Sequence, residues 1–326
     1  MNTFGRNYRV TIFGESHGAG LGVVLDGVPA GIPLSADDFT TDILRRKSGA
    51  LGTTPRIESD TPELLSGVFE GHTTGSPLTV IFRNGNTHSS DYQLFGRIPR
   101  PGHADYVASV KWGGYNDPRG GGHFSGRLTL PVVAAGVVAK KILKADIHAE
   151  LVEVGGIPMC EFGRTKPSLR NFLQEVIDEG DSLGGVVECT VKGLPVGLGE
   201  PFFDSVESLV SHAVFSIPGV RGIEFGDGFE ASRMRGSQHN DPFGPDGRPQ
   251  KNGAGGINGG ITNGSPLVFR VALKPTSSIA RLQKTADIAS GQMTTLQIPG
   301  RHDACFALRT PVVVEAMAAI VLADLL

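Results

Sequence analysis

Cysteine is scarce in this chain. Only Cys160, Cys189 and Cys305 occur among its 326 residues, an odd number with no close spacing. Such a set indicates neither a disulfide framework nor a metal site, which needs ligands at short, regular spacings. The sequence therefore predicts a protein of a reducing compartment, without a bound metal.

An excess of charge of one sign is also lacking. The chain has 30 Lys and Arg residues against 33 Asp and Glu residues, a net charge of -3 at pH 7. A protein that binds nucleic acid by displacing counterions needs a strong basic excess. We therefore expect no nucleic-acid partner, and we expect any arginine cluster to be local.

Long apolar runs are missing as well. The longest, Pro311 to Leu326, contains Glu315 and Asp324 and is shorter than the ~20 residues that span a bilayer. The first residues, Met1 to Arg6, show no apolar core of signal-peptide length. We expect a cytoplasmic protein with no membrane contact, in which residues 311–326 form a buried helix.

Glycine, in contrast, is abundant, and the stretch 97–127 combines it with arginine and histidine. The three consecutive glycines 120–122 can turn several backbone N–H groups toward one anion. The flanking arginines can bind phosphate or carboxylate oxygens with two hydrogen bonds each. The stretch suits a phosphorylated ligand, although a tight surface loop with solvated arginines would have the same composition.

The apolar pattern of the first half predicts its regular elements. Strands are expected at 9–13, 22–26, 64–69 and 78–82, and a buried helix at 128–143. Ser35 and Asp38 form a capping-box pattern that predicts a helix over 36–47. These elements are short and separated by turns, which is typical of a mixed α and β fold.

Polar side chains are expected at two of these element ends. The glycine-flanked turn after the first strand presents Ser16 and His17. The helix over 36–47 ends with Arg45 and Arg46. These two arginines would bind a ligand, or they would only complement the helix dipole at the protein surface.

The second half repeats the order of the first. Residues 193–197 match 27–31, 263–267 match 74–78, 299–303 match 100–103, and 309–313 match 127–133. Four matches in one order indicate a duplicated unit. We expect an α+β fold in which residues 1–326 form a single composite domain. Its halves are about 1–148 and 188–326, and the linker 149–187 joins them.

Four further segments, one in the linker and three in the second half, have local signals. Ser168 predicts a capped helix within the linker, and Asp204 followed by Glu207 predicts another. Residues 234–260 are dense in Gly, Asn, Asp and Pro and predict a long mobile loop. Residues 274–278 offer a cation, hydroxyls and N–H groups that suit a phosphate, although Lys274 could equally be solvated at a strand end.

Taken together, these motifs closely resemble those of the chorismate synthase family. They are, in chain order, Gly14 to Gly18, Arg45-Arg46, Arg100 to Asp105, Arg119 to Gly122, Lys274 to Ser278, and Gly300 to Asp303. Each motif is weak alone, but the ordered set covers the chain almost end to end. The resemblance implies an internally duplicated β-α-β sandwich, unlike the Rossmann fold, and a homotetramer.

The resemblance also implies a reaction of the shikimate pathway, which leads to the aromatic amino acids. The enzyme would be a lyase that eliminates phosphate in the anti-1,4 sense from 5-enolpyruvylshikimate 3-phosphate to give chorismate. Reduced FMN would act as a transient electron donor, and NADPH would be its reductant in some members. Clustered arginine and lysine would then form a local electropositive pocket for phosphate and carboxylate groups.

Three catalytic residues follow from their matching positions. His17 matches the general acid for the leaving phosphate, a role suited to an imidazole. His103 matches the imidazole that supplies a proton to the reduced flavin. Asp303 matches the carboxylate that assists the flavin in removing the ring proton.

Binding residues are implied in the same way. For the substrate they are Ser16, Arg45, Arg46 and Arg127. For FMN they are Arg46, His123, Phe124, Ser125, Gly259, Lys274, Pro275, Thr276, Ser277, Ser278 and Arg301. Three positions depart from common family forms, namely His123-Phe124 in place of Arg-Ser, Gly52 in place of an arginine, and Pro218-Gly219 in place of a more polar pair.

Two other classes of function compete with this interpretation. A non-catalytic module for flavin or anions would keep the binding loops but lack the acid and the base. An RNA-binding protein could also combine arginine with glycine, but the acidic net charge disfavours it.

Overall fold

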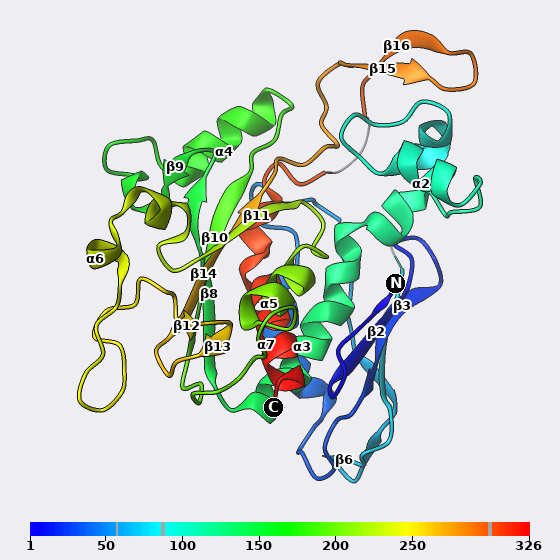
Figure 1. Cartoon of the computed structure of the whole chain (residues 1–326). Helices are drawn as coiled ribbons and strands as arrows, with labels where there is room; N and C mark the ends of the chain where they lie inside the picture. Colours follow the sequence, from blue (N-terminus) through cyan, green and yellow to red (C-terminus); the bar gives the residue numbers. More distant parts are fainter. Residues whose placement is uncertain (57, 86–88, 299–301) are drawn as a thin grey trace.

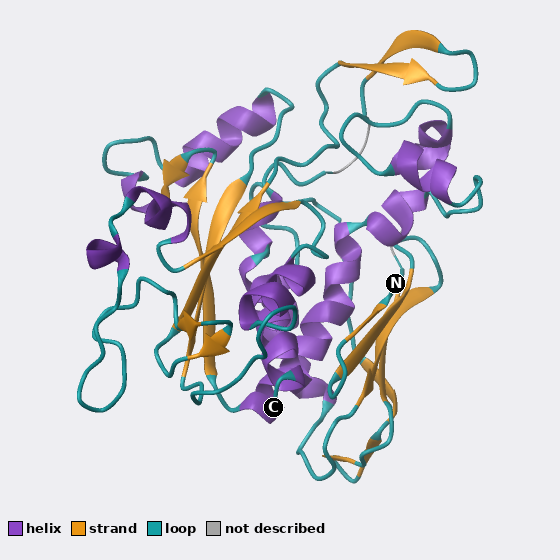
Figure 2. Cartoon of the chain, in the orientation of Figure 1, coloured by secondary structure: helices purple, strands orange, loops and turns teal. Residues whose placement is uncertain are grey.

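Two five-stranded sheets enclose a central layer of helices in the computed structural model of the chain (Figure 1). The structure describes residues 1–56, 58–85, 89–298 and 302–326. Figure 2 shows the strands on two outer sides with helices between them. The described strand pairs of both sheets are antiparallel, whereas a Rossmann sheet is mostly parallel. The expected β-α-β sandwich is therefore confirmed.

The first sheet has the strand order β1-β2-β3-β7-β4. Its strands are β1 (Thr3–Phe4), β2 (Arg9–Gly14), β3 (Gly20–Asp26), β7 (Leu78–Arg83) and β4 (Glu63–Ser66). In β3, the side chains of Leu21, Val23 and Leu25 all point inward and are fully buried. This alternation is typical of a sheet with one face on the core.

The second sheet has the strand order β11-β14-β10-β8-β9. Its strands are β11 (Val220–Phe225), β14 (Leu267–Leu273), β10 (Gly185–Lys192), β8 (Asp146–Val154) and β9 (Ile157–Pro158). Val187, Cys189 and Val191 of β10 are fully buried in the same alternating way. Both sheets thus present one apolar face to the helices between them.

The strand orders of the two sheets correspond, which supports the predicted duplication. Strands β2, β3, β4 and β7 occupy the same positions in the first sheet as β8, β10, β11 and β14 in the second, in the same chain order. The segment 149–187, expected as a linker, therefore supplies most of β8, all of β9 and the helix α4 (Leu169–Asp178). Its sequence hid β8, because His148 and Glu150 on the outer face are exposed and interrupt the apolar pattern.

Two apolar helices form the centre of the middle layer. They are α3 (Thr129–Leu143) and α7 (Pro311–Asp324), which pack against each other. Gly136 permits this close packing, because a β-carbon there would lie only 2.4 Å from the β-carbon of Ala316. One hydrophobic cluster includes buried residues of both halves. This continuous core supports the proposal of a single composite domain.

The smaller helices test the capping predictions. The helix predicted over 36–47 begins as the 3-10 turn η1 (Ala36–Phe39) and continues as α1 (Thr40–Arg46), with the capping box of Ser35 and Asp38 present. Ser168 caps α4 as predicted. The cap predicted at Asp204 was wrong by one residue, because Ser205 caps α5 (Val206–Val214) by accepting the N–H of Ser208.

The remaining elements are short and lie mostly at the rims. The helices are η2 (Ser89–Gly96), α2 (Asp105–Lys111), η3 (Arg119–Phe124), η4 (Gly126–Leu128), η5 (Met159–Glu161), η6 (Gly228–Arg233), α6 (Gly236–His239) and η7 (Phe306–Arg309). The strands are β5 (Val68–Phe69), β6 (His72–Thr73), β12 (Ile257–Asn258), β13 (Ile261–Thr262), β15 (Gln283–Asp287) and β16 (Gln292–Leu296). Within the described ranges, no helix is long and apolar enough to cross a bilayer.

Two sequence predictions need refinement. The strand predicted at 64–69 is divided into β4 and β5 by Gly67, whose φ of 83° interrupts a strand. The loop predicted at 234–260 contains α6 and is closed by Asp241, whose carboxylate accepts the N–H groups of Gly253 and Ala254. Its backbone is therefore organised by internal hydrogen bonds.

Candidate active site

Loops and helix ends from both halves of the chain surround a cavity of about 510 Å³. Its walls come from the end of α1, the loop 47–60, the loop before α2, the loop of the three glycines 120–122 (the glycine loop) and the segments 218–221, 274–278 and 302–309. Among the described residues, eight lysine and arginine side chains line it against three carboxylates. This excess of cations in a protein with an acidic net charge makes the cavity a local site for anions.

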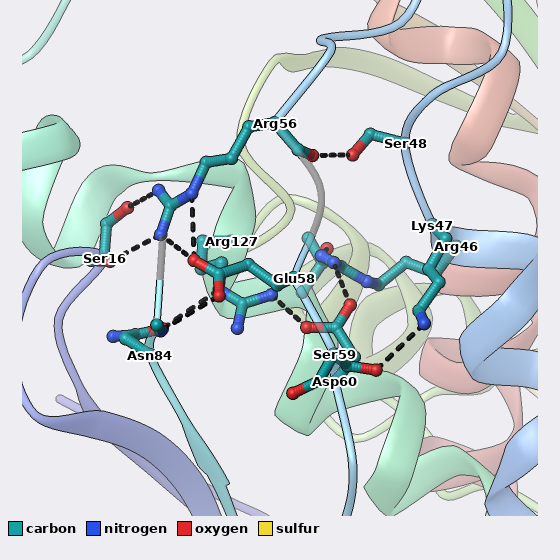
Figure 3. Close-up of polar contacts among 12 residues, drawn as sticks. Ser16, Arg46, Lys47, Ser48, Arg56, Glu58, Ser59, Asp60, Asn84 and Arg127 are labelled. Atoms are coloured by element: carbon teal, nitrogen blue, oxygen red, sulfur yellow. Dashed lines mark hydrogen bonds and ion pairs between the residues drawn. The ribbon is translucent and has the colours of Figure 1, made fainter. Parts of the chain in front are cut away.

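The buried carboxylate of Asp60 joins two of these cations (Figure 3). It accepts a hydrogen bond of 3.2 Å from Arg46 Nη2 and a short one from Arg127 Nη1. Arg46 lies at the end of α1, and Arg127 lies in η4 just before α3. One carboxylate therefore fixes guanidinium groups from two separate elements at the cavity wall.

Some polar atoms that line the site have no hydrogen-bond partner among the described residues. Arg46 Nε and Arg127 Nη2 are buried and make no hydrogen bond, and the same holds for Thr276 Oγ1 on another wall. Burial, together with the positive charges of Arg309 and Arg127, lowers the pKa of Arg46 to about 9 against the attraction of Asp60. Buried donors without partners are costly. These atoms therefore suit an anionic or polar ligand.

A second ion pair, between the partly buried Arg56 and the buried Glu58, supports the turn that carries Ser16 (Figure 3). Arg56 donates to Glu58 Oε1 at 2.7 Å and to the hydroxyl and carbonyl oxygens of Ser16 at 3.1 Å each. Asn84 donates to the carbonyl oxygens of Glu15 and Gly18 and accepts from Arg127 Nε at 3.2 Å. The turn 14–18 is therefore held firmly beside the arginine cluster.

His17 lies in this turn and is buried. Its ring contacts that of Tyr92 edge to face, with a centroid distance of 5.1 Å. Burial lowers the pKa of His17 from 6.5 to about 4, and the positive charges of Arg56 and Arg119 act in the same direction. The imidazole is therefore neutral at pH 7 when no ligand is bound.

The glycine loop lies between the two predicted catalytic imidazoles. A β-carbon on Gly120 would lie 2.3 Å from His17 Cδ2, and one on Gly121 would lie 3.5 Å from His103 Nε2. Both glycines have positive φ, 62° and 80°. The loop thus needs glycine for its backbone and, at Gly120, for close contact with His17.

His103 belongs to a chain of polar contacts at the start of α2. Its Nδ1 lies 2.7 Å from Asp105 Oδ1, and Asp105 also accepts three hydrogen bonds from Arg100. Arg100 in turn donates to Ser278 Oγ at 3.0 Å. The contact connects the first half of the chain with the segment 274–278 of the second half.

Asp303 lies on another part of the cavity wall. Arg309 donates to both of its oxygens, at 3.1 Å and 2.8 Å, and the N–H of Thr54 donates to Oδ1 at 3.0 Å. His103 and Asp303 therefore line the same cavity although 200 residues separate them in the sequence.

Comparison with known proteins identifies the family. The family model described as chorismate synthase matches residues 8–326. The chain belongs to the chorismate synthase family. The chorismate synthase of Chitinophaga pinensis is 59% identical over 327 residues, covering 99% of this chain and 96% of that protein. That of Korarchaeum cryptofilum is 47% identical over 348 residues, covering 98% and 96%.

A crystal structure of a chorismate synthase has the same fold. It is 31% identical, with a TM-score of 0.73 over 99% of this chain and 92% of that chain. The alternative of a non-catalytic flavin or anion module is not supported by these relatives, which carry the name of the enzyme. The described ranges also contain no cluster of residues suited to a metal ion.

Most residues predicted from the chorismate synthase resemblance lie together. The predicted residues that line the cavity are Arg46, His103, Phe124, Ser125, Arg127, Lys274, Pro275, Thr276, Ser277, Ser278 and Asp303. His17 lies directly behind Gly120, which lines the cavity, and Ser16 precedes it. Lys274 donates to Gly102 O at 2.6 Å and to Ser277 Oγ at 2.8 Å, so it is not a freely solvated lysine.

Six predicted positions are not among the lining residues, namely Ser16 and His17 behind the glycine loop and the four that follow. Arg45 pairs with Glu315 of α7 at 2.7 and 2.6 Å, and His123 contacts Gly14 O and Asn2 Oδ1. Gly259 lies between the short strands β12 and β13 and is not among the lining residues. Arg301 lies outside the described residues. In this member of the chorismate synthase family, Arg46 alone of the arginine pair faces the cavity.

Several polar residues of the site were not found from the sequence. Asp60, Arg56 and Glu58 were not singled out, although the run 56–60 alternates basic and acidic residues. Asp105 and Arg309 lie within the sequence motifs and repeats, but the sequence indicates no function for either residue. A charge run of this kind is more often a solvated surface, so its burial was visible only in the structure.

Proposed function

We propose that the protein eliminates phosphate from 5-enolpyruvylshikimate 3-phosphate to form chorismate, with reduced FMN as cofactor. The observation that carries the proposal is the convergence of His103, Asp303 and the arginine cluster on one cationic cavity. The substrate has one phosphate and two carboxylates, and such groups match unpaired guanidinium donors. Membership of the chorismate synthase family supports the same reaction.

The chain's residues fit a bound flavin mononucleotide. The buried Thr276 hydroxyl without a partner, the serines 277 and 278 and the cation of Lys274 offer donors for a phosphate or a ring edge. Phe124 is 38% exposed and offers an apolar surface at the cavity wall. When bound, reduced FMN would transiently donate electron density to the substrate. Ser125, Arg46 and Arg301 are also proposed for this site.

The substrate is held, in this proposal, by Arg46 and Arg127. Their free N–H groups, Nε and Nη2, would bind oxygens of its phosphate or carboxylates. Asp60 keeps both guanidinium groups in place before the ligand arrives, which reduces the entropic cost of binding. Arg45 acts on this site only through the helix end that it shares with Arg46.

The proton transfers are proposed for three side chains. His17 would protonate an oxygen of the leaving phosphate, and His103 would supply a proton to the flavin from Nε2 when its ring carries both protons. Asp303 would assist removal of the proton from the substrate ring, with its orientation fixed by Arg309 and the Thr54 N–H. General acid–base groups of this kind usually contribute about 10²–10⁴ each to the rate.

His17 must gain its proton within the complex. At pH 7 its imidazole is neutral, since burial and then Arg56 and Arg119 lower its pKa to about 4. A phosphate bound beside the glycine loop would offset these positive charges and raise the pKa. The acid would thus become protonated only when the leaving group is present.

Titration of His17 followed by NMR tests this dependence. We expect a midpoint near 4 in the free protein and a higher midpoint after addition of inorganic phosphate. Because the unfolded chain protonates this imidazole near 6.5, the folded state should lose stability as the pH falls from 6.5 to 4. A free-protein midpoint at the ordinary value, unmoved by phosphate, would contradict the assignment.

The reaction itself is tested with the purified chain. Incubation with 5-enolpyruvylshikimate 3-phosphate and anaerobically reduced FMN should release inorganic phosphate and form chorismate. Oxidised FMN serves as the control, because the flavin must be reduced to donate electron density. Phosphate release no faster than in buffer would overturn the proposed function.

NADPH remains a proposed reductant for the flavin. Position 52, where common family forms have an arginine, offers no contact for it. Gly52 has φ 83°, and a β-carbon there would lie 2.8 Å from Leu308 Cδ1 and 3.3 Å from Leu173 Cδ1. A side chain at this position would therefore meet apolar groups. An anaerobic spectrum of the protein with FMN and NADPH tests the proposal through bleaching of the oxidised flavin band.

A homotetramer and a cytoplasmic location complete the proposal. Large aromatic side chains are exposed on the single chain, namely Phe202, Phe203 and Tyr115, with exposed fractions of 88%, 91% and 95%. Such side chains are enriched in protein interfaces. They support the association of several copies, which sedimentation would measure.

A further inference from the structure

The contact between His103 and Asp105 determines which nitrogen of the imidazole faces the ligand. His103 Nδ1 lies 2.7 Å from Asp105 Oδ1, whereas Nε2 faces Gly121 of the glycine loop. A carboxylate accepts hydrogen bonds and donates none when ionised. The neutral imidazole therefore carries its proton on Nδ1, and Nε2 has a free lone pair on the opposite side of the ring.

Asp105 is itself held in one orientation. Its Oδ2 accepts from the N–H and the Nε of Arg100 at 3.0 and 2.8 Å, and its Oδ1 accepts from Nη2 at 2.7 Å. Burial opposes ionisation of Asp105, but the hydrogen bonds from Arg100 and His103 hold the pKa of its carboxyl well below the usual range. The carboxylate is thus ionised and rigid at neutral pH.

Arg100 is fixed in turn by its surroundings. Its guanidinium lies 4.5 Å from the ring centre of Phe95 and donates to Ser278 Oγ at 3.0 Å. Its Nη2 also lies 3.0 Å from His103 Nδ1. Arg100 Nη2 could donate to Nδ1 only if that nitrogen carried a lone pair, and the lone pair would then face the Asp105 carboxylate oxygen at the shorter distance of 2.7 Å. The closer carboxylate therefore favours the proton of the neutral ring on Nδ1, with Arg100 Nη2 donating to Asp105 Oδ1 at 2.7 Å.

We propose that Asp105 is a positioning residue for His103, which fixes the imidazole with its proton on Nδ1 and directs Nε2 to exchange a proton with the bound flavin. The inference rests on the proposed function of the cavity. Asp105 touches no ligand in this arrangement, because it is 5% exposed at the side chain and is not among the lining residues. It acts through the ring that it orients.

The substitution Asp105→Asn tests this role. An amide offers one oxygen and one N–H₂ group where the carboxylate offers two acceptors. Arg100 can only donate, so it cannot bond the amide nitrogen in the place of either carboxylate oxygen. His103 Nδ1 can change from donor to acceptor. The amide nitrogen should therefore settle against Nδ1, and the neutral imidazole should carry its proton on Nε2 instead.

Nitrogen NMR of the flavin-free protein with labelled histidine measures this tautomer directly. We expect the Nδ1–H form of His103 in the wild type and the Nε2–H form in Asp105→Asn. With substrate and reduced FMN, kcat should fall by about 10²-fold, the scale for a positioned acid or base, while KM changes little. A merely structural role would change stability without inverting the tautomer.

Asp287→Asn is the matched control. Asp287 accepts from Arg97 at 2.9 and 2.5 Å, and among the described residues it contacts no histidine and lies outside the cavity lining. This variant should keep both the tautomer and kcat. A wild-type His103 with its proton on Nε2 would overturn the inference even if Asp105→Asn failed to fold, and an unchanged tautomer in a folded variant would do the same. Failure of the wild type to release phosphate would instead remove the proposed reaction and leave the tautomer result standing.

Discussion

Asp60→Asn is expected to lower the free energy of unfolding by about 3–5 kcal/mol, the usual cost of leaving a buried charge without its partner. The carboxylate is 3% exposed and is the shared partner of Arg46 and Arg127. Its loss leaves two guanidinium groups facing each other, with Arg309 close enough to affect Arg46. Asparagine tolerates the left-handed backbone of this residue, φ 54°, so the change removes charge with little backbone strain.

Urea unfolding of the variant measures this loss, with Asp26→Asn as the control. Asp26 pairs with Arg9 at the surface, where the two side chains are 45% and 54% exposed. Such pairs contribute at most about 1 kcal/mol. Inorganic phosphate should restore part of the stability of Asp60→Asn by binding the unpaired arginines. Equal losses of stability in the two variants, or no effect of phosphate, would show that Asp60 does not neutralise the buried charges of Arg46 and Arg127.

The parts of the fold that were predictable are those with a strong local pattern. The buried helix expected at 128–143 is confirmed because its side chains are apolar on every face, and the capping box of Ser35 is visible within four residues. The strand β8 was missed because its outer face is polar. A strand with one solvated face has only half of the apolar signal, and residues 149–154 of β8 were therefore assigned to the linker.

The site was predictable where the residue type carries the chemistry. His103 and Asp303 line one cavity although they come from different halves of the duplicated chain. Arg45 shows the limit of this reasoning. Adjacent helical residues point about 100° apart around the axis, so Arg46 faces the cavity while Arg45 pairs with Glu315. The sequence gives no sign of which arginine of a pair faces inward.

Partners across long sequence distances were also out of reach. Asp60 contacts Arg127 across 67 residues, and Arg100 contacts Ser278 across 178. A pairing of this kind depends on the relative position of two elements, which no local pattern specifies. The polar residues that hold the catalytic groups in place therefore became visible only in the fold.

His103→Ala is expected to reduce kcat by about 10²-fold or more, because it removes the imidazole that is positioned for proton exchange with the flavin. Flavin affinity should change much less, since the other lining residues proposed for FMN, such as Lys274 and Phe124, remain in place. Phosphate release measures turnover, and quenching of flavin fluorescence measures binding. His148→Ala is the control, because His148 is exposed on β8 and should leave both quantities unchanged.

The same pair of measurements separates an enzyme from a binding module. In a module without catalysis, His103→Ala would alter flavin binding alone or nothing at all, since no turnover exists to lose. In the proposed enzyme the loss appears in kcat, because the imidazole Nε2 faces the glycine loop on the ligand side and is held there by Asp105. A variant that binds flavin normally and turns over at the wild-type rate would remove His103 from the mechanism, and with it the proton transfer that Asp105 is inferred to position.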